Sequence, residues 1–352
     1  MKNSSESLSI LKKIVFTLTP LIILLIILEV SLRIVYFQTN SQSPLAIVAS
    51  FRHVRGKVLA AKAKNYVQNY QIPRDALFSA DAKELLEQFQ QEYETNFKML
   101  VEEAQKIQSK LFVLYIPTDL YENPENGLFC RNFFAHLAEK YQLEFIDLSE
   151  EFRKYPLDVL TLLPDDGHLS RFGNQVVAGK LAEYIDKYSN YRTIFQFQKR
   201  VSLFGDLKPS DNSIWQIKPD MPYRVTTNSQ GLRMGYDLTF PKRKQRILAL
   251  GDSVTFGPYL PNHHIYPYLL ERKYSDKEVI NAGVAGYTII DELSLFVERA
   301  RYVEPDITVL QVLDNDISDL FFFKRNEFNR KRGFYQPSEL EKNFLSSLIK
   351  NN

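Results

Sequence analysis

The sequence predicts an α/β fold built on a parallel sheet, and three observations support this. Short apolar runs, each long enough for one buried strand, alternate with longer stretches of helical periodicity. Strands that alternate with helices in this way are typical of βαβ units, whose strands are parallel. At 352 residues and 45% hydrophobic composition, the chain can bury one large core or two modest ones. The strand-like runs are residues 111–116, 143–147, 246–250, 277–280 and 306–313.

The helices are predicted from apolar residues that recur every three to four positions. The longest such stretch covers residues 81–110 and forms a continuous amphipathic face. Asn126-Gly127 predicts a loop before the next helix. The stretch 191–234 is rich in proline, shows no clear period, and is interpreted as a linker or surface excursion. The remaining predicted helices are residues 129–141, 174–188, 266–273, 291–302 and part of the tail 321–352.

The N-terminus carries a predicted membrane anchor. Residues 14–28 are almost wholly apolar, and continuing to residue 37 gives about the 20 residues that a membrane helix needs. Lys12 and Lys13 favour a cytoplasmic N-terminus, although basic residues also follow the segment. No small-residue cleavage site follows, which favours an uncleaved signal anchor over a signal peptide. We therefore expect a single-pass membrane protein whose soluble part is periplasmic or extracellular; the alternative is a buried core helix.

Composition narrows the functional classes. The net charge of +2 gives no indication of a nucleic-acid partner. The single cysteine, Cys130, excludes an internal disulfide framework and a cysteine-based zinc site. No cluster of His, Asp and Glu has the spacing of metal ligands, so no metal or other cofactor is expected. The sequence specifies no oligomeric state.

The most informative segment is residues 246–257. Its apolar run ends in Gly251-Asp252-Ser253, and Gly257 closes the segment. A buried parallel strand here would bring the Ser253 hydroxyl to the carboxyl edge of the sheet, where α/β folds bind ligands. A serine hydroxyl is unreactive until a base takes its proton, so a partner histidine is expected elsewhere in the chain.

Three other segments accompany this serine. Residues 281–288 and Asn315 each follow a predicted strand, and residues 165–168 read Asp-Asp-Gly-His before a predicted helix. Together with Gly251-Asp252-Ser253, they resemble the sequence blocks of the SGNH (GDSL) hydrolases, a family of serine esterases and deacylases. The resemblance implies a three-layer αβα sandwich with a five-stranded parallel, flavodoxin-like sheet.

The resemblance also implies a role for each site residue. Ser253 would be the nucleophile and His168 the general base. The Asp-x-x-His spacing of the family selects Asp165 to orient the histidine, while Asp166, two residues before it, remains the alternative. The oxyanion would be held by the backbone N–H groups of Ser253 and Gly286 and by the Asn315 side-chain amide.

The other histidines are not assigned to the catalytic site, and Asp314 is an argument against the oxyanion role of Asn315. His263 and His264 are interpreted as residues at the rim of the site or on the surface, and His53 and His136 as surface or helix positions. Asp314 stands directly before Asn315, which departs from the family's Gly-x-Asn-Asp block. A second carboxylate there would oppose oxyanion stabilisation.

The order of the blocks is inverted, because the family's histidine normally lies downstream of its serine. The second half of the chain supplies the family's first three strands, and the first half supplies the last two strands, the histidine block and the final helix. We therefore predict one circularly permuted domain, with tandem incomplete domains, a strand-swapped dimer or a gene-model artefact as alternatives. The predicted organisation is a cytoplasmic N-terminus (1–13), the anchor (14–37), a connection (38–80), the C-terminal half of the fold (81–190), a linker (191–240) and the N-terminal half of the fold (241–352).

The functional expectation follows from the resemblance and from the anchor. We expect a membrane-anchored serine esterase or deacylase whose substrate is an acylated small molecule or polysaccharide, with O-acetyl groups of extracytoplasmic glycans the favoured target. The alternatives are an O-acyltransferase that uses the same triad, and a non-catalytic carbohydrate-binding or assembly module.

Overall fold

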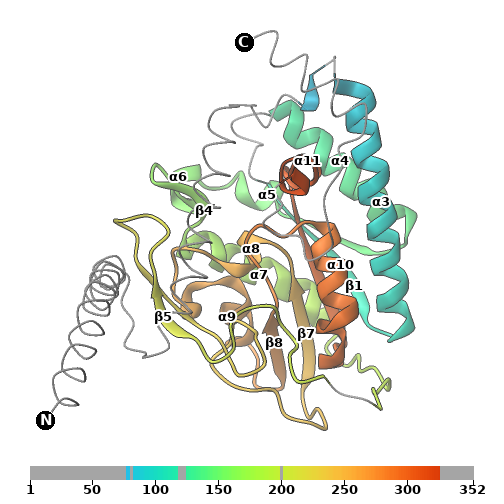
Figure 1. Cartoon of the computed structure of the whole chain (residues 1–352), viewed down its shortest axis with the longest axis vertical. Coiled ribbons are helices and arrows are strands. Elements are labelled where there is room, and N and C mark those ends of the chain that lie inside the picture. Colours follow the sequence, from blue (N-terminus) through green and yellow to red (C-terminus); the bar gives the residue numbers. More distant parts are fainter. Residues whose placement is uncertain (1–76, 80–81, 118–123, 199–200, 326–352) are drawn as a thin grey trace, which may run out of the picture. The chain divides into compact units, whose positions relative to one another are not determined.

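The computed structural model describes residues 77–79, 82–117, 124–198 and 201–325 (Figure 1). The predicted anchor, most of the connection that follows it, and the tail beyond residue 325 lie outside these ranges. Within them, no helix combines the length and the apolar character needed to cross a membrane.

One five-stranded parallel sheet contains strands from both halves of the chain. Its order is β2-β1-β9-β7-β8, with β9 in the centre, pairing with β1 on one side and β7 on the other. Counted from β7 as the first strand, this order reads 2-1-3-4-5, which is the flavodoxin-like order. The circular permutation itself stays a prediction. The strands are β1 (Lys110–Ile116), β2 (Glu144–Asp147), β7 (Gln245–Leu250), β8 (Lys277–Asn281) and β9 (Ile307–Leu313).

Helices cover both faces of the sheet, so the predicted three-layer sandwich is confirmed (Figure 1). On β1, Val113 and Tyr115 pack toward one face and Phe112 and Leu114 toward the other, because successive side chains of a strand alternate. The first face is covered by α3 (Lys83–Lys106), α4 (Pro124–Lys140), α10 (Ile289–Glu298) and α11 (Asp316–Arg325), and the second by α7 (Arg171–Lys187) and α9 (Tyr266–Glu271). The shorter elements are α5 (Ser149–Phe152), α6 (Leu157–Leu160), β3 (Thr161–Leu162), β4 (Asp166–Leu169), β5 (Asn212–Trp215), β6 (Tyr223–Thr226), α8 (Ser253–Phe256), η3 (Asn262–His264) and η4 (Ala300–Val303).

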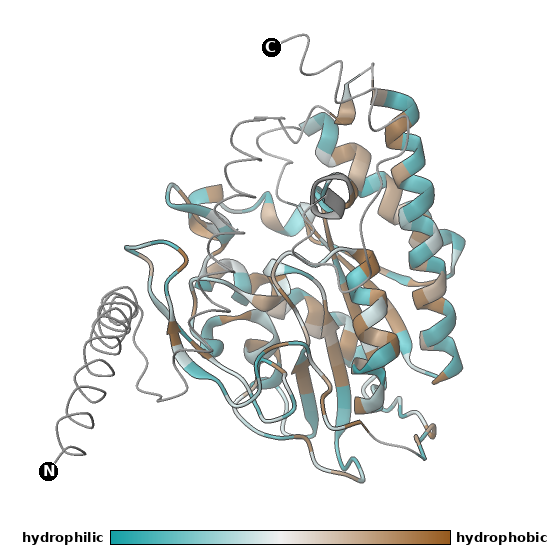
Figure 2. Cartoon of the chain, viewed as in Figure 1, coloured by the Kyte–Doolittle hydropathy of each residue, from teal (hydrophilic) through white to brown (hydrophobic). Residues whose placement is uncertain are grey.

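The long amphipathic helix predicted near the start of the domain is confirmed as α3. Figure 2 shows hydrophobic and hydrophilic residues alternating along it. The side chains of Phe89, Tyr93 and Phe97 are fully buried in the core between α3 and the sheet. Burying one such side chain contributes about 1.5–3 kcal/mol, so this face outweighs helix propensity in stabilising α3.

The loop predicted at Asn126-Gly127 is wrong, because both residues lie inside α4. Pro124 and Glu125 open that helix. Proline has the backbone angle of a first helical turn and lacks an N–H that would stay unpaired there, and a carboxylate favours the positive end of the helix dipole. Gly127 is buried, and its carbonyl oxygen lies 3.1 Å from the Tyr115 hydroxyl oxygen, so the glycine lies against β1.

The stretch interpreted as a linker or excursion contains an ordered hairpin. Strands β5 and β6 pair antiparallel, with Trp215 opposite Tyr223. Each strand is only four residues long, too short for its alternation to stand out in the sequence.

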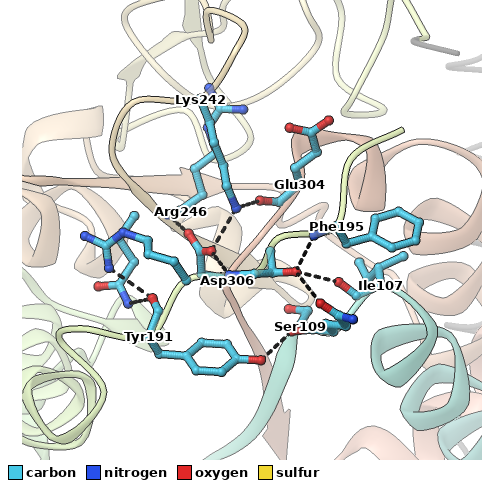
Figure 3. Close-up of polar contacts among 12 residues, drawn as sticks. Ile107, Ser109, Tyr191, Phe195, Lys242, Arg246, Glu304 and Asp306 are labelled. Carbon is cyan, nitrogen blue, oxygen red and sulfur yellow. Dashed lines mark hydrogen bonds and ion pairs between the residues drawn. The ribbon is translucent and has the colours of Figure 1, made fainter. Parts of the chain in front are cut away.

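Asp306 joins this stretch to the amino ends of the sheet strands. It is fully buried directly before β9, and its carboxylate accepts hydrogen bonds from the backbone N–H groups of Thr193 (2.6 Å) and Arg246 (2.8 Å). The Lys242 ammonium pairs with it at 2.8 Å; Figure 3 shows Lys242, Arg246 and Asp306 together. One carboxylate therefore ties the chain after α7 to both β7 and β9.

Replacing Asp306 with alanine is expected to destabilise the fold by about 3–5 kcal/mol, because it leaves two buried N–H groups without their acceptor and Lys242 without its carboxylate partner. The free energy of unfolding in urea measures this. Glu150→Ala is the matched control, since Glu150 forms an exposed pair with Arg153 that contributes less than about 1 kcal/mol. Equal losses in the two variants would contradict the role given to Asp306.

Candidate active site

Ser253 lies at the carboxyl edge of the sheet, directly after β7. Gly251 and Asp252 connect the strand to α8, which begins at Ser253. The Asp252 side chain caps α8 by accepting a hydrogen bond from the Val254 N–H (2.9 Å). The cap fixes where the helix begins and leaves the serine half-buried at the strand end.

The loop after β8 packs against this turn. The Val284 N–H donates to the Gly251 carbonyl (3.1 Å), and a Cβ on Gly283 would lie 2.5 Å from the Phe256 nitrogen. No side chain fits in that space, so a glycine is required for the two loops to meet. The carboxyl ends of β7, which is followed by Ser253, and of β8, which is followed by Gly283, are thereby held together.

His168 is carried by β4, which pairs antiparallel with β3. Just beyond β4, Ser170 caps α7 by accepting from the Gly173 N–H (3.1 Å). The buried Asn174 side chain then donates to the Ser170 carbonyl (2.9 Å) and accepts from the Tyr266 N–H of α9 (2.8 Å). These bonds hold the histidine segment beside the helix that follows the serine.

The structure brings Ser253 and His168 into hydrogen-bond contact. The Ser253 Oγ and His168 Nε2 atoms lie 2.9 Å apart, although the residues are 85 positions apart in the sequence. The hydroxyl has a second neighbour, the Asp252 Oδ2 atom, at 3.3 Å. The distance from the serine oxygen to His168 Nε2 is the shorter of the two, so the geometry favours His168 as acceptor of the serine proton.

Asp166, and not Asp165, contacts the other ring nitrogen of His168. The Asp166 Oδ1 atom lies 2.5 Å from Nδ1 and also accepts from the His168 backbone N–H (2.9 Å). The preference for Asp165 is therefore corrected. The segment is the strand β4, in which side chains two residues apart share a face, whereas the Asp-x-x-His spacing assumes a loop.

The second oxygen of Asp166 is also engaged. The Lys218 Nζ atom lies 2.8 Å from Oδ2, and the Tyr259 ring packs edge-on against the His168 ring at a centroid distance of 6.0 Å. Burial acts to raise the pKa of Asp166, but hydrogen bonds from His168 and Lys218 outweigh it and hold that pKa well below its usual value. The carboxylate is therefore charged at neutral pH.

The two predicted oxyanion residues lie at the same edge of the sheet. Gly286 occupies the turn after β8 with φ of 81°, and Asn315 is the second residue after the end of β9. The Asn315 side-chain amide donates one of its two N–H groups to the Asp319 carboxylate (2.9 Å). The second N–H group is not needed for this hydrogen bond. The oxyanion roles of both residues stay predictions.

Asp314, the residue expected to oppose an oxyanion, is almost fully buried. Its carboxylate accepts a hydrogen bond from the Tyr115 hydroxyl, and its backbone carbonyl accepts one from the Cys130 thiol (3.0 Å). The extra carboxylate is thus hydrogen-bonded within the core, at β1.

The remaining histidines lie apart from this cluster. His263 and His264 lie in η3 with their rings in edge-on contact, at a centroid distance of 4.2 Å, and burial lowers the pKa of His264. His136 is exposed on α4, and His53 lies outside the described residues. In the described ranges, no group of three or more His, Cys, Asp or Glu residues has a metal-binding arrangement.

The sequence-based reasoning missed two residues of this cluster, Lys218 and Tyr259. Both belong to irregular segments, and nothing in their local sequence marks them. Tyr259 has φ of 62°, a conformation that is rare for an aromatic residue and that only the folded backbone reveals.

The fold and the cluster define a class of protein: an α/β sandwich that carries a Ser–His–Asp constellation at the carboxyl edge of its parallel sheet. No protein-family model and no curated protein matches the chain. Among solved structures, it is similar to the O-acetyltransferase domain of Pseudomonas putida AlgJ, with 16% identity and a TM-score of 0.44 over 79% of this chain and 95% of that one. It is also similar to Pseudomonas aeruginosa AlgX, with 16% identity and a TM-score of 0.39 over 70% of this chain and 60% of that one.

Proposed function

We propose that this chain is a serine-dependent enzyme that removes acyl groups from an oxygen ester. The observation that carries the proposal is the continuous hydrogen-bonded series Ser253–His168–Asp166. In such a series the histidine removes the serine proton, and the carboxylate orients the ring and stabilises its charged form.

The proposed reaction has two steps. The Ser253 Oγ attacks the ester carbonyl while its proton passes to His168 Nε2, and Asp166 stabilises the imidazolium. The tetrahedral intermediate expels the alcohol oxygen, which takes the proton back from His168, and the acyl group remains on Ser253. In the second step, His168 takes a proton from an incoming hydroxyl, whose oxygen attacks the acyl-serine carbonyl. The bond between the acyl carbon and Ser253 Oγ then breaks, Oγ takes the proton back from His168, and the acyl group leaves on the incoming oxygen.

The oxyanion of each tetrahedral intermediate needs donors that are already in place. We assign this role to the backbone N–H groups of Ser253 and Gly286 and to the Asn315 amide. Removing one donor of this kind typically costs about 3–4 kcal/mol of transition-state stabilisation.

The proposed substrate is an O-acetylated glycan outside the cytoplasm. The location rests on the predicted anchor at residues 14–37, and the substrate rests on that location together with the SGNH resemblance. A second candidate is transfer of the acyl group to a glycan hydroxyl. The His168 side chain is 29% exposed, so an acceptor hydroxyl can reach the histidine as water can.

The test is the fate of the acyl group. Washed membranes that carry the full chain would be supplied with p-nitrophenyl acetate, with and without a glycan acceptor. Ester cleavage predicts free acetate in both cases, whereas transfer predicts acetylated glycan when the acceptor is present. If p-nitrophenol release matches that of membranes carrying Ser253→Ala, both functions are excluded.

A further inference from the structure

Lys218 reaches the Ser–His–Asp series from the hairpin stretch and contacts it from the side opposite Ser253. Its Nζ atom pairs with Asp166 Oδ2 at 2.8 Å and also donates to the Asp165 backbone carbonyl. The same ammonium lies 5.5 Å from the centre of the Tyr259 ring. Asp166 therefore divides its two oxygens, with Oδ1 toward His168 and Oδ2 toward Lys218.

The hairpin that carries Lys218 is packed on the helix that carries Ser253. The Trp215 ring lies against the Phe256 ring of α8, at a centroid distance of 5.4 Å. The Trp215 Nε1–H also donates to Asp211 (3.3 Å), which fixes the ring within the hairpin. Lys218 lies three residues beyond Trp215. Its position is therefore set by the packing of the hairpin on α8, the helix that begins at Ser253.

Four charged or titratable groups surround the His168–Asp166 pair. Lys218 and Tyr259 lie on the Asp166 side, and Asp252 lies behind Ser253 and acts electrostatically on His168. Asp165 acts on Lys218, through both its charge and its carbonyl. Lys218 is the only cation among the four, so it alone offsets the negative charge that Asp166 presents to the histidine.

We propose that Lys218 is a positioning residue that partly neutralises Asp166 and thereby sets the pH range in which His168 acts as a base. This inference rests on the proposed function. A carboxylate bound only to His168 would stabilise the imidazolium fully and keep the histidine protonated, and so inactive as a base, up to a higher pH. The lysine ammonium, paired with Oδ2, offsets part of the negative charge of the carboxylate and also fixes the plane of the carboxylate.

The test compares the pH dependence of kcat/KM in the full-length wild-type chain and three variants. In Lys218→Met, the acidic limb is expected to move to higher pH by about half a unit to one unit, as expected for loss of a single charge a few ångströms away. Lys218→Arg keeps the charge and is expected to restore the wild-type limb. Lys208→Met is the matched control, because Lys208 belongs to the same stretch but pairs only with Asp211, at 3.5 Å.

A second readout does not depend on activity. The pH midpoint of the His168 ring resonance, followed by NMR and assigned with His168→Gln, is expected to rise in Lys218→Met and to stay unchanged in Lys208→Met. An unchanged or lowered midpoint, or an acidic limb that does not move, would overturn the proposal. If the wild-type chain is inactive but the midpoint rises as expected, the proposed function fails while the electrostatic role of Lys218 stands.

Discussion

Replacing Ser253 with alanine is expected to lower kcat/KM for p-nitrophenyl acetate by about 10⁴-fold or more, because no other atom takes the place of the attacking oxygen. His168 and Asp166 keep their contact with each other in this variant, so the melting temperature should change little. A fluorophosphonate probe should label the wild-type chain at Ser253 and should not label the variant. Peptide mass spectrometry of the labelled chain locates the adduct.

Ser189→Ala provides the control, since Ser189 lies just beyond α7 and outside the cluster. It should retain wild-type activity and labelling. A Ser253→Ala variant that keeps the wild-type rate would exclude covalent catalysis by serine. If only His168→Ala were inactive, His168 would instead act as a base on water.

The second prediction with a large effect distinguishes the roles of the neighbouring residues Asp165 and Asp166. Asp166→Asn is expected to lower kcat by about 10²–10⁴-fold, because an uncharged amide cannot stabilise the imidazolium and can hold the ring in the wrong tautomer. Asp165→Asn should change kcat by less than about threefold, because its side chain makes no hydrogen bond with His168 in the structure and only its backbone carbonyl accepts from Lys218.

The pair of variants tests the correction made by the structure. The two substitutions are chemically identical and adjacent, so they change the net charge of the chain equally. Equal losses of kcat, or a larger loss in Asp165→Asn, would show that the carboxylate partner of His168 differs from the one observed.

Much of the fold could be predicted because burial imposes a period on the sequence. The five strands lie within a few residues of their predicted positions, since each is a short apolar run enclosed by helices on both faces. Ser253 and His168 could also be selected from the sequence, because each lies beside a recognisable strand or turn, and the structure brings them into contact. The count of strands predicted one closed sheet, and β9 closes it by pairing with both β1 and β7.

What could not be predicted depends on local geometry or on distant contacts. The choice of Asp166 over Asp165 turns on whether the segment is a strand or a loop, and four residues are too few to show a period. Lys218 stands in a stretch whose hairpin is equally short, and its position is fixed by Trp215 packing on Phe256. The Asn126-Gly127 pair is typical of turns, yet the packing of α4 on β1 overrides that local preference.

The central place of β9 has a consequence for how the protein is made. A chain synthesised from its N-terminus produces β1 and β2 first, then β7 and β8, and β9 last, although β9 is the strand that joins the two pairs. Until it emerges, β1 and β7 each have an open edge, and the sheet cannot close. A nascent or shortened chain that lacks β9 would therefore contain both the serine and its histidine, already translated, before the sheet that supports the serine can close.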